Sequence, residues 1–409
     1  MSDIRTLLRV RDFRLLFVGQ AMSNWGDALT NLTLLILTQR YTGSTAAVAG
    51  TAIAVALPQL LFGMVAGVYV DRWDRKRVMV VSDVVRGILV LGFVLFTSAD
   101  QIWLMYALAF LQATVGAFFN PAKGAMIPHV VGRERLLAAN STMETSRIVA
   151  GLLGTAAAGL YLGVFETVWP IFLVDGVTFA SSALFERALR SPSRDAAPAA
   201  PGGVWQEMTA GIRAALRSRI LVGVLMSGGV LMLGLGAVNV LLVPFVVGDL
   251  GVSESWFGAI EASQVSSMVL SGALVAALAS RFRPDRIVVT GMIGIGIVLA
   301  GIATVTTVWQ FMLALFAVGW FVTPLQAGVS TIVQSEVPDA MRGRIGAALQ
   351  TILQTANIGS MALAGVVAAA IGSRGVFVAA GGLAVVGGLV GLALFRGAHS
   401  PLPTPEAAT

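Results

Sequence analysis

Apolar segments of about twenty residues recur along the whole chain, separated by short turns rich in charge, glycine or proline. A helix needs about 20 apolar residues to cross a hydrocarbon core roughly 30 Å thick. The pattern therefore predicts an all-α membrane protein with twelve transmembrane helices, of which the last two are separated only by "GSRG" at 372–375. The predicted spans are 12–39, 45–70, 78–98, 102–127, 139–163, 167–189, 219–247, 253–280, 286–306, 309–334, 343–371 and 376–396.

The composition agrees with a bilayer as the solvent. The 409 residues are 56% hydrophobic and 12% charged, whereas soluble domains carry about 25% charged residues. The absence of cysteine excludes thiolate chemistry, and the only histidines, His129 and His399, do not favour a metal site. The basic start of the chain lacks the short apolar core and cleavage signal of a secretory peptide, so we expect the first apolar run to remain as a helix.

The basic residues predict the orientation. Of 27 Lys and Arg, only Arg40 and Arg374 fall in turns that follow odd-numbered helices. This asymmetry is the positive-inside pattern and predicts an inner-membrane protein with both termini in the cytoplasm. The formal charge of +6 is then a topology signal, and nucleic acid is not an expected partner.

The longest polar stretch divides the chain into two halves. We expect a six-helix bundle at 1–190, a cytoplasmic linker at 191–218, a second bundle at 219–398 and a cytoplasmic tail at 399–409. In the linker, Trp205, Met208, Ile212 and Leu216 have helical spacing, which fits an interfacial helix or a soluble linker helix. Short repeats in the same order, such as "GAFFNP" at 116–121 and "GWFVTP" at 319–324, indicate duplication of six helices.

A dense charge cluster, "GVYVDRWDRK", lies between the second and third spans. Its spacing of glycine, aspartate and basic residues resembles the signature of the major facilitator superfamily. Together with "SNWGD", "FFNPAKGAMIP" and "PDAMRGRIGA", it is similar to the branch that holds macrolide-type drug exporters and the enterobactin exporter. The resemblance covers essentially the whole chain and implies the major facilitator fold, two pseudo-symmetric bundles with helices 1, 4, 7 and 10 lining a central cavity.

The same resemblance implies a conformational latch. In it Asp71 docks at the cytoplasmic start of helix 11, whose N-terminus carries a partial positive charge. The residues it implies are Gly67, Asp71, Arg72, Arg75, Lys76, Arg342 and Arg344. The family's antiporter motif is incomplete here, because Thr155 and Leu160 replace its proline and last glycine.

Polar residues at helical spacing inside the predicted spans are the candidate site. Gln20, Asn24, Asp27 and Asn31 form one stripe on the first helix, which must face a partner helix or a wet cavity. Asp27 is near mid-depth with no Lys or Arg within one turn, so we expect it to carry a proton, with Glu261 as the next candidate. The cavity candidates are Gln20, Asn24, Asn31, Gln112, Asn120, Gln326, Gln350, Gln354 and Asn357; interhelical hydrogen bonding explains the asparagines equally well.

Two ion pairs at i, i+3 spacing, Asp83 with Arg86 and Glu144 with Arg147, are expected to be structural. Asp175 has no local partner and no assigned role. Large side chains near the polar stripes suit a bulky apolar substrate or plain core packing; they are Trp25, Phe118, Phe119, Met143, Trp320 and Phe321.

The sequence thus predicts a secondary transporter that exports amphipathic small molecules in exchange for protons, acting as a monomer without a cofactor. Uptake of a small nutrient by the same fold is the alternative. No HExxH, GxSxG or phosphate-binding glycine motif occurs, so the sequence does not predict an enzyme or an ATP-driven pump.

Overall fold

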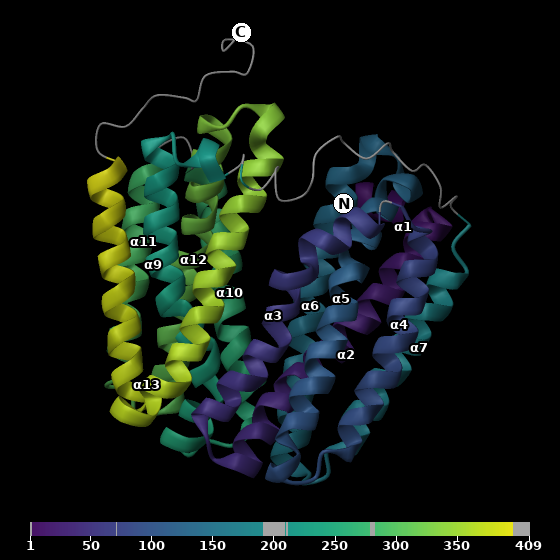
Figure 1. Ribbon diagram of the computed structural model, residues 1–409, viewed down its shortest axis with the longest axis horizontal. Coiled ribbons are helices and arrows are strands. Elements are labelled where there is room, and N and C mark those ends of the chain that lie inside the picture. The colour runs from purple at the N-terminus through teal and green to yellow at the C-terminus, as the bar shows by residue number, and fades with distance from the viewer. Residues whose placement is uncertain (1, 71, 191–208, 210–211, 279–282, 396–409) are drawn as a thin grey trace. The chain divides into compact units, whose positions relative to one another are not determined.

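The computed structural model describes residues 2–70, 72–190, 209, 212–278 and 283–395. The described residues are almost entirely helical and contain no β-strand. They form two compact units, one made of helices α1 to α7 with the short segment Ser253–Gly258, and one made of helices α9 to α13 (Figure 1).

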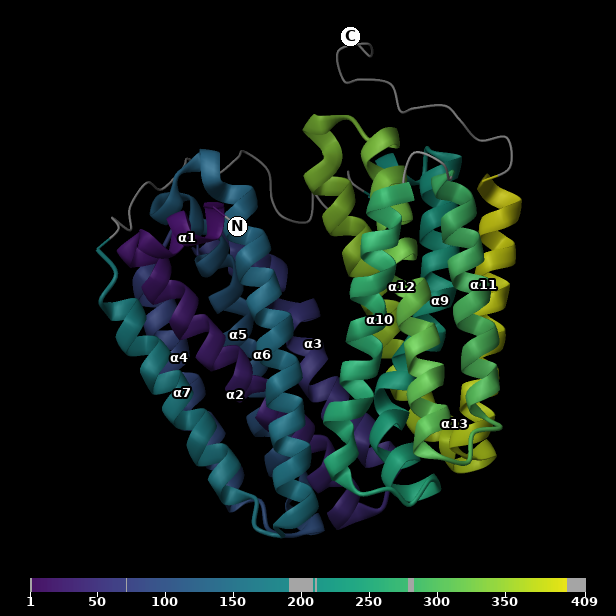
Figure 2. The same cartoon turned by 180° about the vertical axis from the view of Figure 1, so that it is seen from behind.

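The first unit begins with a short helix, α1, and continues with six long helices. Within it α2 packs against α6 and α7, α3 against α5, and α4 against α5 and α7. Figures 1 and 2 show these helices from opposite sides. The bounds are α1 Ser2–Arg9, α2 Arg11–Thr42, α3 Thr45–Val70, α4 Arg75–Gly92, α5 Ile102–Val131, α6 Leu136–Val164 and α7 Trp169–Arg187.

In the second unit, α13 packs against both α9 and α11, and α11 packs against α12. A single π-helical turn, Pro244–Asp249, follows α9, and a 3-10 turn, Glu254–Trp256, precedes α10. The bounds are α9 Arg219–Val243, α10 Phe257–Leu278, α11 Pro284–Ile302, α12 Val308–Glu336 and α13 Asp339–Phe395.

Each of the twelve predicted spans corresponds to a helix or to one arm of a helix. The break expected at 372–375 is present, because Gly372 has φ 70° and ψ 167° inside α13. Only glycine adopts this backbone conformation at little cost, and it divides α13 into two arms. Helix starts also follow local chemistry: the Asp74 carboxylate accepts a hydrogen bond from Arg77 N at 2.9 Å and caps α4.

Eight helices of the described chain are long and apolar enough to cross a membrane, and one of these, Ile345–Phe395, is the pair of arms joined at Gly372. Helices α2, α7 and α10 are not among the eight. In α2 and α7 the reason is visible in the fold, since both carry buried polar residues that lower their mean hydropathy.

The interior of the first unit is layered along the helices. One apolar cluster gathers around Phe13, Leu16 and Met79, near the starts of α2 and α4. Another gathers around Phe93 and Phe172, near the opposite end of the unit. Between these two clusters in chain position, α2, α4 and α7 carry buried polar and charged side chains, which form a polar layer.

Some predictions fall outside the described residues. These are the linker 191–208, the tail 399–409, Asp71, and the side chains of Arg342 and Arg344. Of the expected linker helix, residues 212–215 are described and helical.

Candidate functional site

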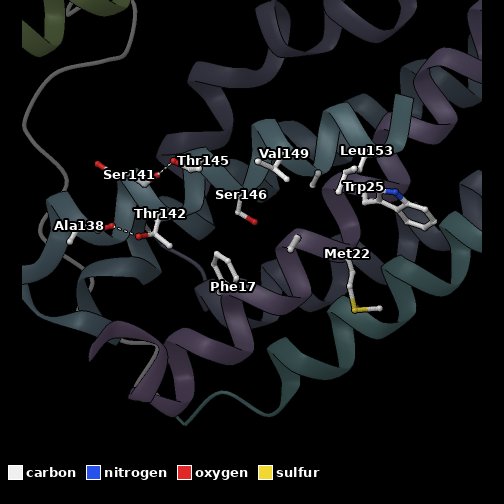
Figure 3. A pocket seen from close by; sticks show the side chains of 12 residues that line it. Phe17, Met22, Trp25, Ala138, Ser141, Thr142, Thr145, Ser146, Val149 and Leu153 are labelled. Carbon is white, nitrogen blue, oxygen red and sulfur yellow. Dashed lines mark hydrogen bonds between the residues drawn. The ribbon is translucent and has the colours of Figure 1, made fainter. Parts of the chain in front are cut away.

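A pocket of about 730 Å³ lies between α2 and α6 in the first unit. Phe17, Met22 and Trp25 come from α2, and the hydroxyl residues and Val149 and Leu153 come from α6 (Figure 3). Its lining is mostly apolar, with a row of small hydroxyl groups along α6. Pockets of this size and character suit small organic ligands.

The hydroxyl groups of this pocket are held in different ways. Thr142 and Thr145 donate to carbonyl oxygens one turn earlier in α6, at 2.7 and 2.8 Å. Ser146 extends from α6 toward α2, close to Phe17 (Figure 3). The pocket therefore offers an aromatic and aliphatic surface with a limited number of hydrogen-bonding positions, which fits an amphipathic molecule.

A charged network lies in the polar layer of the same unit. Arg86 on α4 donates from Nη2 to both carboxylate oxygens of Asp27 on α2, each at 2.7 Å. Its Nη1 lies 3.6 Å from the Asp83 carboxylate, and its guanidinium lies 4.3 Å from the centre of the Phe179 ring. We call the set Asp27, Asp83, Arg86, Lys123, Asp175 and Glu186 the buried charged network.

Two further carboxyl groups of the network come from α7. Thr30 Oγ1 donates to Asp175 Oδ2 at 2.5 Å, and Gln20 Nε2 donates to Glu186 Oε1 at 3.4 Å. Both carboxyl groups are completely buried, as is Asp83. A glycine makes this possible at Asp175, because a Cβ at position 26 of α2 would overlap the Asp175 carboxyl.

The structure corrects the picture of Asp27. The sequence places no cation within a turn of it, yet Arg86, 59 residues away in the chain, pairs with it directly. The expectation of an isolated carboxyl was wrong, because spacing along one helix does not reveal a partner that lies on another helix. The ion pair of Glu144 with Arg147 is confirmed at 2.6 Å, and Asp83 does approach Arg86, although less closely than Asp27 does.

The other polar candidates are dispersed. Gln20 joins the network through Glu186, and Gln112 is buried in α5. Three of the candidates in the first unit, Asn24, Asn31 and Asn120, remain partly or fully exposed, as do those in the second unit: Glu261, Gln326, Gln350, Gln354 and Asn357. None of the nine cavity candidates lines the α2–α6 pocket.

The described residues of the expected latch make contacts inside the first unit. Arg75 Nη1 lies 2.6 Å from His129 Nε2 of α5, and Lys76 Nζ donates to the Leu189 carbonyl at 2.6 Å. Arg72 is exposed and Gly67 is partly buried. These contacts join the start of α4 to the ends of α5 and α7, and they leave the role of Asp71 a prediction.

Glu186 is not among the site residues predicted from the sequence, and Asp175 had no assigned role. The signal was present, because Asp175, Thr178, Ser182 and Glu186 are spaced 3, 4 and 4 residues apart and so share one face of α7. That spacing had identified the polar stripe on the first helix. The hydroxyl row of the α2–α6 pocket, on α6, was missed as well.

The long apolar helices, with a charged network buried among them, are those of a multi-pass membrane protein. The chain belongs to the major facilitator superfamily, since the family described as "Transmembrane secretion effector" matches residues 5–407. It is accordingly a transporter and not an enzyme.

Its relatives include transporters that carry substances out of cells. The chain is 23% identical over 380 residues to macrolide efflux protein A of Streptococcus pyogenes, covering 91% of this chain and 93% of that one. It is 26% identical over 405 residues to the enterobactin exporter EntS of Citrobacter koseri, covering 97% and 95%. The fold is similar to that of a point mutant of the nucleoside transporter NupG, with a TM-score of 0.76 at 14% identity over 94% of this chain and 100% of that one.

Proposed function

We propose that the protein exports amphipathic small molecules, of the macrolide or siderophore kind, in exchange for protons. The observation that carries this proposal is the α2–α6 pocket, which combines an apolar wall with a hydroxyl row and lies in the same unit as a network of buried carboxyls. The names of the relatives, a macrolide efflux protein and an enterobactin exporter, favour export over uptake.

The proposal includes the orientation with both termini in the cytoplasm. The two basic residues that the positive-inside pattern leaves outside are both held by local contacts. Arg40 donates to the Leu162 carbonyl at 2.6 Å and pairs with Glu254 at 3.0 Å, and Arg374 donates to the carbonyls of Ala303 and Val305. These local contacts account for the two arginines on the predicted outer side. The excess of Lys and Arg on the other side therefore still supports cytoplasmic termini.

Proton exchange can supply the energy for export. One proton crossing a potential of 100 mV releases about 2.3 kcal/mol, and each unit of pH gradient adds about 1.4 kcal/mol. Together they support accumulation ratios well above tenfold. The test is efflux of a labelled macrolide and of a siderophore from a pump-deficient host, with and without a protonophore. Export that persists after collapse of the proton gradient would contradict the coupling.

Filling the pocket should block export selectively. Ser146→Trp places an indole between α2 and α6, where Phe17 already forms the facing wall. We expect efflux of the labelled macrolide to fall by about tenfold or more, the effect of losing about 1.4 kcal/mol of binding. The matched control is Leu160→Trp, on the same helix at a side chain that is 59% exposed and outside the pocket. Equal efflux by the two variants would exclude the pocket as the substrate site.

The latch remains part of the proposal. Asp71→Asn is expected to lower transport while leaving the protein in the membrane at its normal level. The control is Asp74→Asn, three residues on, which changes the carboxylate that caps α4. Because asparagine also caps helices well, this variant should lose little stability and keep its transport rate. Both variants are measured by efflux of the labelled macrolide from the pump-deficient host. Full efflux by Asp71→Asn would exclude a role of Asp71 in the transport mechanism.

A further inference from the structure

One face of α7 is a continuous buried polar stripe. It consists of Asp175, Thr178, Ser182 and Glu186, which are 0, 4, 0 and 1% exposed. Its ends, Asp175 and Glu186, are eleven positions apart, a length of about 16 Å along a helix. We call these four residues the α7 stripe. Buried polar groups of this number on one helix are expensive unless partners or protons satisfy them.

Several oxygens of this region have no hydrogen-bond partner among the described residues. They are both carboxyl oxygens of Asp83, Oε2 of Glu186 and Oγ of Ser182. Ser182 lies beside the carboxyls of both Asp83 and Glu186, at the middle of the stripe. An ionised carboxylate with too few hydrogen bonds in a dry interior costs several kcal/mol, and a bound proton removes this cost.

The charges of the network do not balance. Its acids outnumber its basic groups by four to two; the acids are Asp27, Asp83, Asp175 and Glu186, and the basic groups are Arg86 and Lys123. Glu144 and Arg147 on α6 also lie near Lys123, but they neutralise each other in their own ion pair. Since Arg86 pairs with Asp27, only Lys123 remains to balance the three other carboxyls. About two bound protons would make the network neutral.

The surroundings keep bulk water away from the stripe. Phe179 of α7 packs under the Arg86 guanidinium and belongs to the apolar cluster that includes Phe93 and Phe172. At the other end, the cluster around Phe13 and Met79 includes Leu189, three residues beyond Glu186. Glu186 lies one residue before the end of α7, so it is the carboxyl of the stripe with the shortest distance to that end of the unit.

We propose that the α7 stripe and the neighbouring Asp83 of α4 together form a proton-binding site, in which Asp83, Asp175 and Glu186 hold exchangeable protons while Asp27 stays ionised against Arg86. A proton moves from the O–H of one carboxylic acid to a carboxylate or to water, with Thr178 and Ser182 between the carboxyls, and no other reactant is needed. This inference extends the proposed proton exchange, and only the direction in which protons flow depends on that proposal. The predicted proton carrier changes from Asp27 to the carboxyls in and beside α7.

Infrared difference spectroscopy of the full chain in lipid nanodiscs, after a step in pH, detects protonated carboxyls directly. We expect the wild type to show a carboxylic acid signal at neutral pH. Glu186→Gln, Asp83→Asn and Asp175→Asn should each lose part of it, whereas Asp27→Asn should retain it. The matched control is Glu144→Gln, whose side chain is 56% exposed and which should also retain the signal. A wild type without the signal, or a loss confined to Asp27→Asn, would overturn the proposal.

A second variant covers the case in which a carboxyl variant does not fold. Ser182→Ala keeps every carboxyl and removes only the hydroxyl beside Asp83 and Glu186. It should shift the pH midpoint of the infrared signal; an unchanged midpoint would overturn the stripe as one connected site.

Vesicles with an imposed pH gradient and a labelled macrolide separate this inference from the proposed function. A wild type that shows the infrared signal but no uphill transport would refute the coupling and support the site. Proton-driven transport that is unchanged in Glu186→Gln would support the coupling and refute the site.

Discussion

Replacing Arg86 with glutamine is expected to destabilise the first unit by about 3–5 kcal/mol, because it leaves the Asp27 carboxylate inside the helical bundle without its cation. Arg86 contacts Asp27 through two hydrogen bonds of 2.7 Å and lies 3.6 Å from Asp83. Only 12% of the Arg86 side chain and 26% of the Asp27 side chain are exposed, so water can replace these contacts only in part. The measurement is thermal denaturation of the purified protein in detergent, where we expect a fall in the midpoint on the order of 10 °C.

A double variant tests whether the unpaired Asp27 carboxylate causes the loss of stability. Adding Asp27→Asn to Arg86→Gln removes the carboxylate that has lost its cation, so part of the lost stability should return. The control is Arg147→Gln, since Arg147 and its partner Glu144 are each 56% exposed and such pairs contribute about 0–1 kcal/mol. A melting midpoint for Arg86→Gln equal to that of Arg147→Gln would show that the pair does not hold the unit together.

Gly26→Ala should destabilise the protein although alanine is the better helix former. In a helix interior alanine is favoured over glycine by about 0.8–1 kcal/mol. At position 26, however, the new Cβ would overlap the Asp175 carboxyl and the Thr178 hydroxyl on α7. Forcing atoms into a packed interior costs about 1–3 kcal/mol. The clash also displaces the carboxyl that accepts from Thr30 at 2.5 Å, which adds to the loss.

The control for the predicted clash at Gly26 is Gly151→Ala on α6, where a Cβ would meet no atom within 4 Å. This control should keep or raise the melting midpoint, whereas Gly26→Ala should lower it. If Gly26→Ala also raised the midpoint, α2 and α7 would not be as closely packed as the structure has them. Asp175→Ala in the Gly26→Ala background removes the overlapping group and should recover part of the loss.

Much of the fold could be predicted because a bilayer imposes simple rules on sequence. Backbone groups in hydrocarbon must be satisfied within the segment, so long apolar runs are helices and their limits follow from charge, glycine and proline. The predicted span 45–70 coincides with helix α3, Thr45–Val70. The break between the last two predicted spans is at Gly372, within the "GSRG" that predicted it. The resemblance carried by "GVYVDRWDRK" likewise indicated the superfamily, which the family match shows.

The candidate site was predicted less well. Spacing shows which residues share a face of one helix, and this was enough to select the stripe that holds Gln20 and Asp27. It was also enough to find the pair of Glu144 with Arg147, since both partners are on one helix. The same rule applied to α7 would have found Glu186, so that omission was avoidable.

By itself, then, the sequence determined the class of the protein, the helices and the polar faces, because these depend on local periodicity and on solvation by the membrane. Only the tertiary structure decided which faces meet. Arg86 pairs with Asp27 across two helices, Gly26 admits Asp175, and α2 and α6 line an open pocket to which none of the polar candidates contributes. These contacts depend on the rotation and depth of each helix against its neighbours, and a residue's spacing along its own helix carries no information about either.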